Sequence, residues 1–184
     1  SAASDVYKRQ GKEYYNQKDT EKAKSLLKEA GYNNEKIVLV TTPDYAEMYN
    51  ATLVVQEQLK KAGFNAEVES YDFSTFMEHR ADPKQFDMFI TSNTYNMLPI
   101  QLSVLDSGWA GLNSPEVAEG IAAIRAAATE EEAANEWAKL QTFLYENGAA
   151  TVLGHYTGVS AMNKNVEGTD YLRFQIYWGA SAAE

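Results

Sequence analysis

Residues 37–40 read Ile37-Val-Leu-Val40, a short run of apolar, mostly β-branched residues without any charge. Such a run is typical of a strand that is buried on both faces of a parallel sheet. Two more strands are expected further along the chain. Apolar and polar residues alternate in Phe64-Asn-Ala-Glu-Val-Glu-Ser-Tyr71, which predicts a half-exposed strand. The segment Phe86-Asp-Met-Phe-Ile-Thr91 predicts the third.

Helical patterns precede and separate these strands. Asp19 can cap a first helix, which Gly31 ends. Pro43 precedes a longer helix that reaches about Ala62. The expected apolar stripe of that helix consists of Ala51, Val54, Val55, Leu59 and Ala62. With a short helix over residues 74–80, the order is β-α-β-α-β. Right-handed crossovers then predict the α/β class, with an open, mainly parallel sheet flanked by helices.

After the third strand the periodic pattern stops. Residues 92–112 are polar, aromatic and rich in glycine, and they follow a strand directly. In open α/β sheets, loops at the carboxyl ends of strands are where ligands bind. Tyr95 and Trp109 are the candidate contacts there, because aromatic rings offer a large contact area at a low entropic cost. The alternative is that residues 92–112 form only a long surface loop.

Two further helices and an irregular tail complete the chain. Ser114-Pro115-Glu116 has the cap, first-turn proline and acidic residue of a helix start. Its buried stripe is expected to be Val117, Ile121, Ile124 and Ala128. Thr129 and Glu132 form a capping box for the second helix. The residues spaced to pack against the first helix are Ala133, Trp137, Leu140 and Leu144. The short link favours an antiparallel pair. In the tail, short strands and loops are expected at residues 150–153, 155–156, 159–162 and 171–178.

Composition excludes several classes of function. The formal net charge is −10, which disfavours a phosphate backbone, so nucleic acid is not an expected partner. There is no cysteine, which excludes thiol chemistry and disulfides. His79 is expected on a solvated helix face and His155 near the core, and neither has a spaced partner ligand. No catalytic motif is present. We therefore expect no enzyme activity, no cofactor and no metal.

The first ten residues differ from the rest. Ser1–Gln10 shows no helical or strand period and resembles a translated sequencing adapter, so we expect a non-native leader there. Residues 11–184 are expected to form a single α/β lobe.

The ordered motifs resemble those of a known family. Residues 19–32 read Asp19-Thr-Glu-Lys-Ala-Lys-Ser-Leu-Leu-Lys-Glu-Ala-Gly-Tyr32, which resembles a segment of the oligopeptide-, dipeptide- and nickel-binding proteins. These are the family 5 extracellular solute-binding proteins of ABC transporters. The likeness continues in the same order over about residues 12–178, through Ile37–Thr42, Val55–Val68, Phe86-Asp87-Met88, Asn113–Leu144, Val152–Met162 and Val166-x-Gly168.

The resemblance implies a fold, a function and partners. It implies the C-terminal lobe of a two-lobed, type II periplasmic-binding-protein-like fold, as a fragment without its N-terminal lobe. Such a protein is the substrate-binding component of an ABC importer and holds a small solute, such as an oligopeptide, in the interlobe cleft. The implied partners are a small-molecule or peptide ligand, the ABC permease subunits and the N-terminal lobe. The implied location is the periplasm or the outer face of a bacterial cytoplasmic membrane, with a lipid anchor.

The sequence departs from the family at one ligand motif. Peptide binders that it resembles often carry Trp-x-x-Asp after the third strand, and the Asp accepts the amino terminus of the peptide. Here Asn93 and Asn96 occupy the Trp and Asp positions, and a neutral amide lacks that charge-assisted pairing. The candidate ligand residues are thus Asn93, Tyr95, Asn96 and Trp109. A peptide that is read by its backbone and a neutral ligand such as an oligosaccharide both stay open. Two other classes of function stay open: the ligand-sensing lobe of a transcription regulator, and an enzyme with the same fold.

Overall fold

The computed structural model describes residues 17–93, 99–101, 105, 114–154, 159, 161–171 and 175–182. The chain divides into two compact units, Ser1–Ala150 and Thr151–Glu184, which are described separately. In the described part of the chain, no helix is both long enough and apolar enough to cross a membrane.

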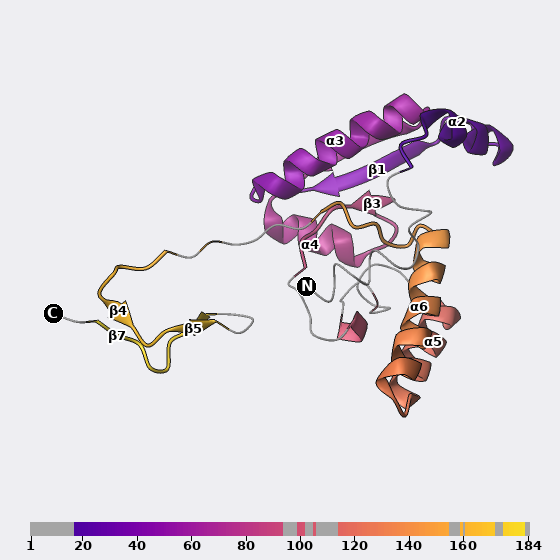
Figure 1. The fold of residues 1–184 in the computed structure, drawn as a ribbon. Coiled ribbons are helices and arrows are strands. Elements are labelled where there is room, and N and C mark those ends of the chain that lie inside the picture. The colour runs from indigo at the N-terminus through magenta and orange to yellow at the C-terminus, as the bar shows by residue number, and fades with distance from the viewer. Residues whose placement is uncertain are drawn as a thin grey trace. The chain divides into compact units, whose positions relative to one another are not determined.

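The first unit contains a three-stranded parallel sheet. Strand β1 (Lys36–Thr41) lies in the centre, between β2 (Asn65–Ser70) and β3 (Met88–Phe89), so the strand order is β2-β1-β3. Figure 1 shows β1 running alongside helix α3. Leu39 and Val40 of the apolar run are fully buried, and so is Thr41 after it, whereas Ile37 and Val38 are half-buried. The edge strand β2 alternates between buried Ala66 and exposed Glu67. The predicted α/β class with a parallel sheet is confirmed.

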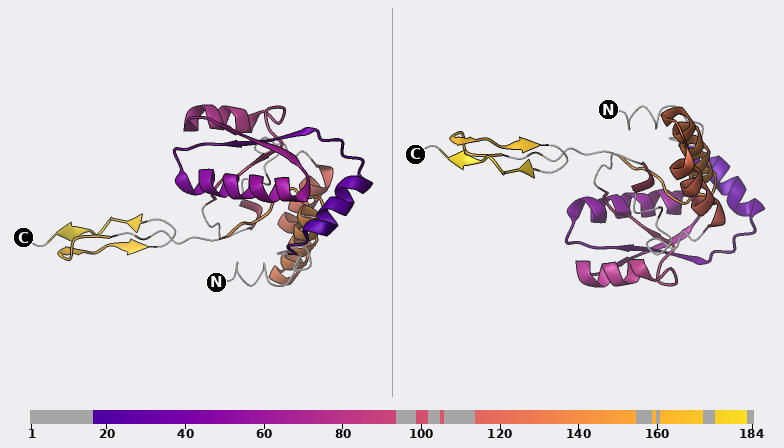
Figure 2. Two further views of the ribbon diagram at one scale, coloured as in Figure 1. Left: turned by 90° about the horizontal axis from the view of Figure 1, so that it is seen from above. Right: turned by 90° about the horizontal axis from the view of Figure 1, so that it is seen from below.

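Helices cover both faces of this sheet (Figures 1 and 2). Helix α3 (Ala46–Ala62) meets the face to which Thr41 points, and α4 (Phe73–Ala81) meets the opposite face, where Val40 lies against Phe76. Helix α2 (Thr20–Glu29) begins at Asp19, whose carboxylate accepts the backbone N–H of Lys22 at 2.9 Å. The predicted helices are therefore present.

The predicted apolar stripe of α3 is wrong at one position. Val54 is 56% exposed, while Met48, Thr52 and Ala62 are buried. Val54 follows Thr52 by two residues, so it points to the opposite side of the helix. The sequence pattern failed here because the buried face of α3 includes a threonine, which an apolar count does not see.

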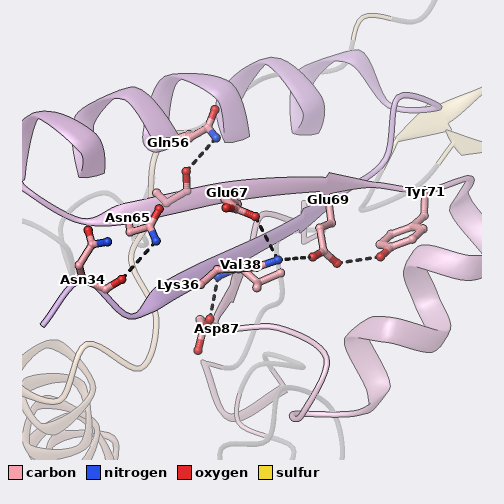
Figure 3. Close-up of polar contacts among 10 residues, drawn as sticks. Asn34, Lys36, Val38, Gln56, Asn65, Glu67, Glu69, Tyr71 and Asp87 are labelled. Atoms are coloured by element: carbon pink, nitrogen blue, oxygen red, sulfur yellow. Dashed lines mark hydrogen bonds and ion pairs between the residues drawn. The ribbon is translucent and has the colours of Figure 1, made fainter. Parts of the chain in front are cut away.

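Strand β3 is shorter than predicted. Only Met88 and Phe89 pair with β1, whereas the sequence favoured a strand over residues 86–91. Before the ladder, the backbone N–H of Asp87 donates to the carbonyl oxygen of Val38 at 3.0 Å, and the carboxylate of Asp87 accepts the N–H of Val38 at 2.7 Å (Figure 3). The carboxylate of Asp87 thus replaces a main-chain carbonyl as the acceptor for Val38, and the regular ladder begins at Met88.

The helix pair is present as predicted. After the short 3₁₀ helix η1 (Pro99–Gln101), α5 (Pro115–Ala126) and α6 (Glu130–Glu146) lie side by side (Figure 1). Both hydrogen bonds of the capping box between Thr129 and Glu132 are formed. The buried core of the pair consists of Leu105, Val117, Leu140 and Leu144, with Ile121, Ile124 and Trp137 packed against it. Ala128 was expected in this stripe, but it is exposed because the backbone leaves the helix at Ala127.

The second unit contains short antiparallel ladders. Strand β4 (Val166–Glu167) pairs with β7 (Ser181–Ala182), and β5 (Asp170–Tyr171) pairs with β6 (Gln175–Ile176). Tyr171 and Gln175–Ile176 fall within the expected segment 171–178, whereas residues 150–154 and 161–162 form no strand. The non-native leader and the single lobe over residues 11–184 stay predictions.

Candidate ligand-binding site

The carboxyl ends of β1, β2 and β3 meet at one edge of the sheet, because the three strands are parallel. We call the residues that follow them, 42–45, 71–73 and 90–93, the carboxyl edge. Since β1 is central, the residues after β1 lie between the ends of the other two strands. This is the edge at which open α/β sheets bind ligands.

One of the four predicted ligand residues lies on this edge. Asn93 follows β3 and is exposed. Tyr95, Asn96 and Trp109 lie outside the described residues, so their meeting with Asn93 stays a prediction. Leu105, from the same predicted loop, is 5% exposed and packs in the core of the helix pair. At that position the segment is core, and not only surface loop.

Buried hydroxyl groups support the carboxyl edge from below. Thr41, Thr42 and Thr52 are all fully buried. The Thr52 hydroxyl donates to the carbonyl oxygen of Met48 at 2.8 Å, and the Oγ1 atoms of Thr52 and Thr41 are 3.1 Å apart. Because a hydroxyl has only one proton, Thr41 must donate to Thr52. These bonds fix the start of α3 against the end of β1.

Two exposed aromatic rings stand on the carboxyl edge, and we call Tyr45 and Phe73 the edge aromatic pair. Tyr45 is 42% exposed and Phe73 is 37% exposed. Their ring centroids are 4.9 Å apart, with an angle of 63° between the ring planes. The sequence analysis missed both residues. The signal that was available is an aromatic residue within five positions of the end of a predicted strand.

The carboxyl edge is also braced by a buried arginine. Arg80 is 9% exposed, and its guanidinium lies 5.8 Å from the ring centroids of both Phe76 and Phe89. Its Nη1 donates to the Thr91 hydroxyl at 3.4 Å. Burial lowers the pKa of the Arg80 guanidinium below its ordinary value. The arginine therefore holds the chain just before Asn93 against α4.

A cluster of charged side chains links the strands β1 and β2 (Figure 3). The Nζ of Lys36 lies 3.1 Å from Glu67 and 3.0 Å from Glu69, and the Tyr71 hydroxyl donates to Glu69 at 2.8 Å. The hydrogen bond from Tyr71, together with that from Lys36, holds the pKa of Glu69 below its ordinary value of 4.5. Hydrogen bonds to Glu69 and Glu67 raise the pKa of Lys36. One ammonium group on β1 thus bridges two carboxylates on β2, so this cluster stabilises strand pairing.

The environment of His79 differs from the prediction. Its ring stacks on Tyr71, with centroids 4.1 Å apart and planes at 22°, and it is half-buried. In the described part of the chain, its Nδ1 is buried and has no hydrogen-bond partner. The prediction of a solvated face was wrong because α4 lays its last turn over the end of β2. His155 lies outside the described residues. Among the residues that are described, no group of three His, Asp or Glu side chains could hold a metal ion.

Comparison with protein families identifies one match. The model of the bacterial extracellular solute-binding proteins, family 5 Middle, matches residues 1–107. Among curated proteins, a probable peptide ABC transporter periplasmic-binding protein of Sinorhizobium fredii is 41% identical over 81 residues. That alignment covers 41% of this chain and 15% of the relative.

Solved structures show the same fold. The oligopeptide-binding protein AppA from Bacillus subtilis, in complex with a nonapeptide, matches with a TM-score of 0.69 at 19% identity, over 90% of this chain and 38% of AppA. The dipeptide-binding protein from Pseudoalteromonas sp. SM9913, in complex with Met-Leu, matches with a TM-score of 0.65 at 17% identity, over 90% of this chain and 36% of that protein. The chain thus spans well under half the length of these relatives. It belongs to family 5 of the bacterial extracellular solute-binding proteins.

Proposed function

We propose that this chain is one lobe of the two-lobed substrate-binding component of an ABC importer, and that its carboxyl edge contacts a peptide. The observation that carries the proposal is the carboxyl edge itself, with Asn93 and two exposed rings, in a chain of a solute-binding family. The family consists of binding proteins, which supports a function without catalysis.

The names of relatives favour a peptide as the solute. The curated relative is described as a peptide-transport protein, and AppA and the dipeptide-binding protein hold peptides, although an oligopeptide-binding protein of similar fold from Thermotoga maritima holds mannohexaose. Asn93 and Asn96 replace the Trp-x-x-Asp pattern, so we propose that the amino terminus of the peptide is not held by a charge at position 96. The peptide is then read through its backbone and side chains.

The proposed partners and location follow from the same role. The ligand closes the two lobes upon each other, and the permease subunits in the membrane recognise the closed protein. The protein acts in the periplasm or at the outer face of the cytoplasmic membrane, held there by a lipid anchor. The sequence ahead of this lobe in the two-lobed protein tests the location. A secretory signal there would support it, whereas a helix-turn-helix segment there would support a transcription regulator.

A thermal-shift screen of the two-lobed protein tests the proposal. The probes are tetrapeptides, oligosaccharides and nickel chelates. A ligand at a hundredfold excess over its dissociation constant should stabilise the native state by about 2.7 kcal/mol. Stabilisation by peptides supports the proposal, and stabilisation by oligosaccharides alone contradicts the peptide assignment. No response to any of the three classes contradicts the transport role.

A variant pair tests the reading of the amino terminus. Asn96→Asp should increase the affinity for a free-amine peptide relative to its N-acetylated form, because a carboxylate pairs with an ammonium group. Asn93→Asp is the matched control on the same segment and should change this ratio less. Equal effects of the two variants would contradict the alignment of position 96 with the amino terminus.

A further inference from the structure

The edge aromatic pair is exposed but firmly held. The backbone N–H of Phe73 donates to the carboxylate of Asp44 at 2.7 Å, which joins the residues after β2 to those after β1. The Asp44 N–H in turn donates to the buried Thr42 hydroxyl at 3.3 Å. Phe76, fully buried, lies behind Phe73 with ring centroids 6.3 Å apart. Rings that are already fixed lose little further freedom when they bind a ligand.

The carboxylates beside the pair are engaged with the backbone. Asp44 accepts the N–H of Phe73, and Asp72 accepts both the N–H and the hydroxyl of Thr75 at 3.1 and 2.7 Å. These hydrogen bonds lower the pKa of Asp72. Both carboxylates hold the loops after β1 and β2 in place. Tyr45 and Phe73, which follow them in sequence, expose apolar ring surface to solvent.

The angle between the rings favours one kind of ligand group. Planes at 63° form a corner that contacts an alkyl or aryl group on two sides. A sugar ring stacks instead on one open aromatic face. We propose that Tyr45 and Phe73 form a subsite for an aliphatic or aromatic side chain of the peptide ligand, an inference that rests on the proposed function.

Peptide selectivity of the two-lobed protein tests this subsite. The probes are tetrapeptide pools with Ala, Leu or Phe fixed at each position in turn, and binding is measured by calorimetry. At one position Leu and Phe should bind about tenfold more tightly than Ala. Tyr45→Ser and Phe73→Ser should each reduce that preference to about threefold or less, with the affinity for tetra-alanine kept within about twofold. Val54→Ser, at an exposed apolar residue on the outer side of α3, should retain the full preference.

The outcomes separate this inference from the proposed function. If the unsubstituted protein binds peptides but both serine variants keep the full preference, the subsite is refuted and the transport role stands. If the unsubstituted protein binds no peptide, both are refuted.

A second measurement needs no variant. A tetrapeptide with benzoylphenylalanine at the selected position should crosslink within residues 44–48 or 72–76, and crosslinks confined to other segments would overturn the subsite.

Discussion

Replacement of Thr52 by valine removes the hydroxyl that joins α3 to β1. Thr52 and Thr41 are both fully buried, and Thr52 donates to Met48 while it accepts from Thr41. Valine keeps the shape but leaves the fully buried Thr41 hydroxyl without the acceptor that Thr52 provides. A buried polar group that loses its partner costs about 1–3 kcal/mol. Thr52→Val should therefore lower the free energy of unfolding by about 2 kcal/mol.

The same substitution at the partner residue, Thr41, should lower the free energy of unfolding by a smaller amount. Thr41→Val leaves the Thr52 hydroxyl bonded to Met48, so only one hydrogen bond is lost, at about 1 kcal/mol. The double variant leaves no stranded hydroxyl, and its cost should not exceed that of Thr52→Val alone. Urea unfolding followed by circular dichroism measures all three values. Thr142→Val is the control, because Thr142 bonds only within its own helix, to the carbonyl oxygen of Ala138 at 3.0 Å. Additive costs within about 0.5 kcal/mol would refute the hydrogen bond between Thr41 and Thr52.

Three further predictions concern acid stability, a helix cap and two glycines. Because the pKa of Glu69 is lowered, its ionised form stabilises the fold above pH 4.5, and this contribution disappears as the pH falls through the lowered value. Glu69→Gln should flatten the acid end of a plot of urea midpoint against pH, and an unchanged plot would contradict the pairing. Thr129→Ala should cost about 1 kcal/mol by calorimetry. Adding Glu132→Ala should cost little more, whereas full additivity would mean that the two do not act as one capping box. Gly168→Ala should change the NMR signals of the β4–β7 ladder, because its Cβ would overlap the carbonyl oxygen of Gly179. Gly31→Ala, at a similar positive φ in open space, should cost about 1–2 kcal/mol, and equal effects would refute the close approach.

Local sequence patterns predicted most of the fold. The β-branched run at residues 37–40, the cap at Asp19 and the capping box at Thr129 all act through residues close in sequence. Their periods of two or of three to four residues are direct consequences of strand and helix geometry. The α/β class and the helix pair followed from these signals.

The errors arise where tertiary contacts decide. The length of β3 depends on the carboxylate of Asp87, which bonds to a residue 49 positions away. The position of His79 depends on α4 packing over Tyr71. The buried face of α3 includes Thr52 because a hydroxyl on β1 faces it. None of these partners can be identified from a local period.

The candidate site was predicted in part. The rule for parallel sheets led to the segment after β3, and Asn93 lies at the carboxyl edge. Tyr45 and Phe73 were not predicted, because they come from two loops that meet only when β1 and β2 pair. The ligand-binding roles of Asn93, Tyr95, Asn96 and Trp109 all stay predictions.

Hydrogen–deuterium exchange on the two-lobed protein tests the central claim most directly. The exchange of backbone amides is compared with and without the tetrapeptide that binds most tightly in the thermal-shift screen. If the carboxyl edge contacts the ligand, exchange should slow in residues 41–48, 71–76 and 90–112. It should stay unchanged at the amino ends of β1 and β2, in residues 31–36 and 63–65. Slower exchange confined to those amino ends, with none at the carboxyl edge, would contradict the account.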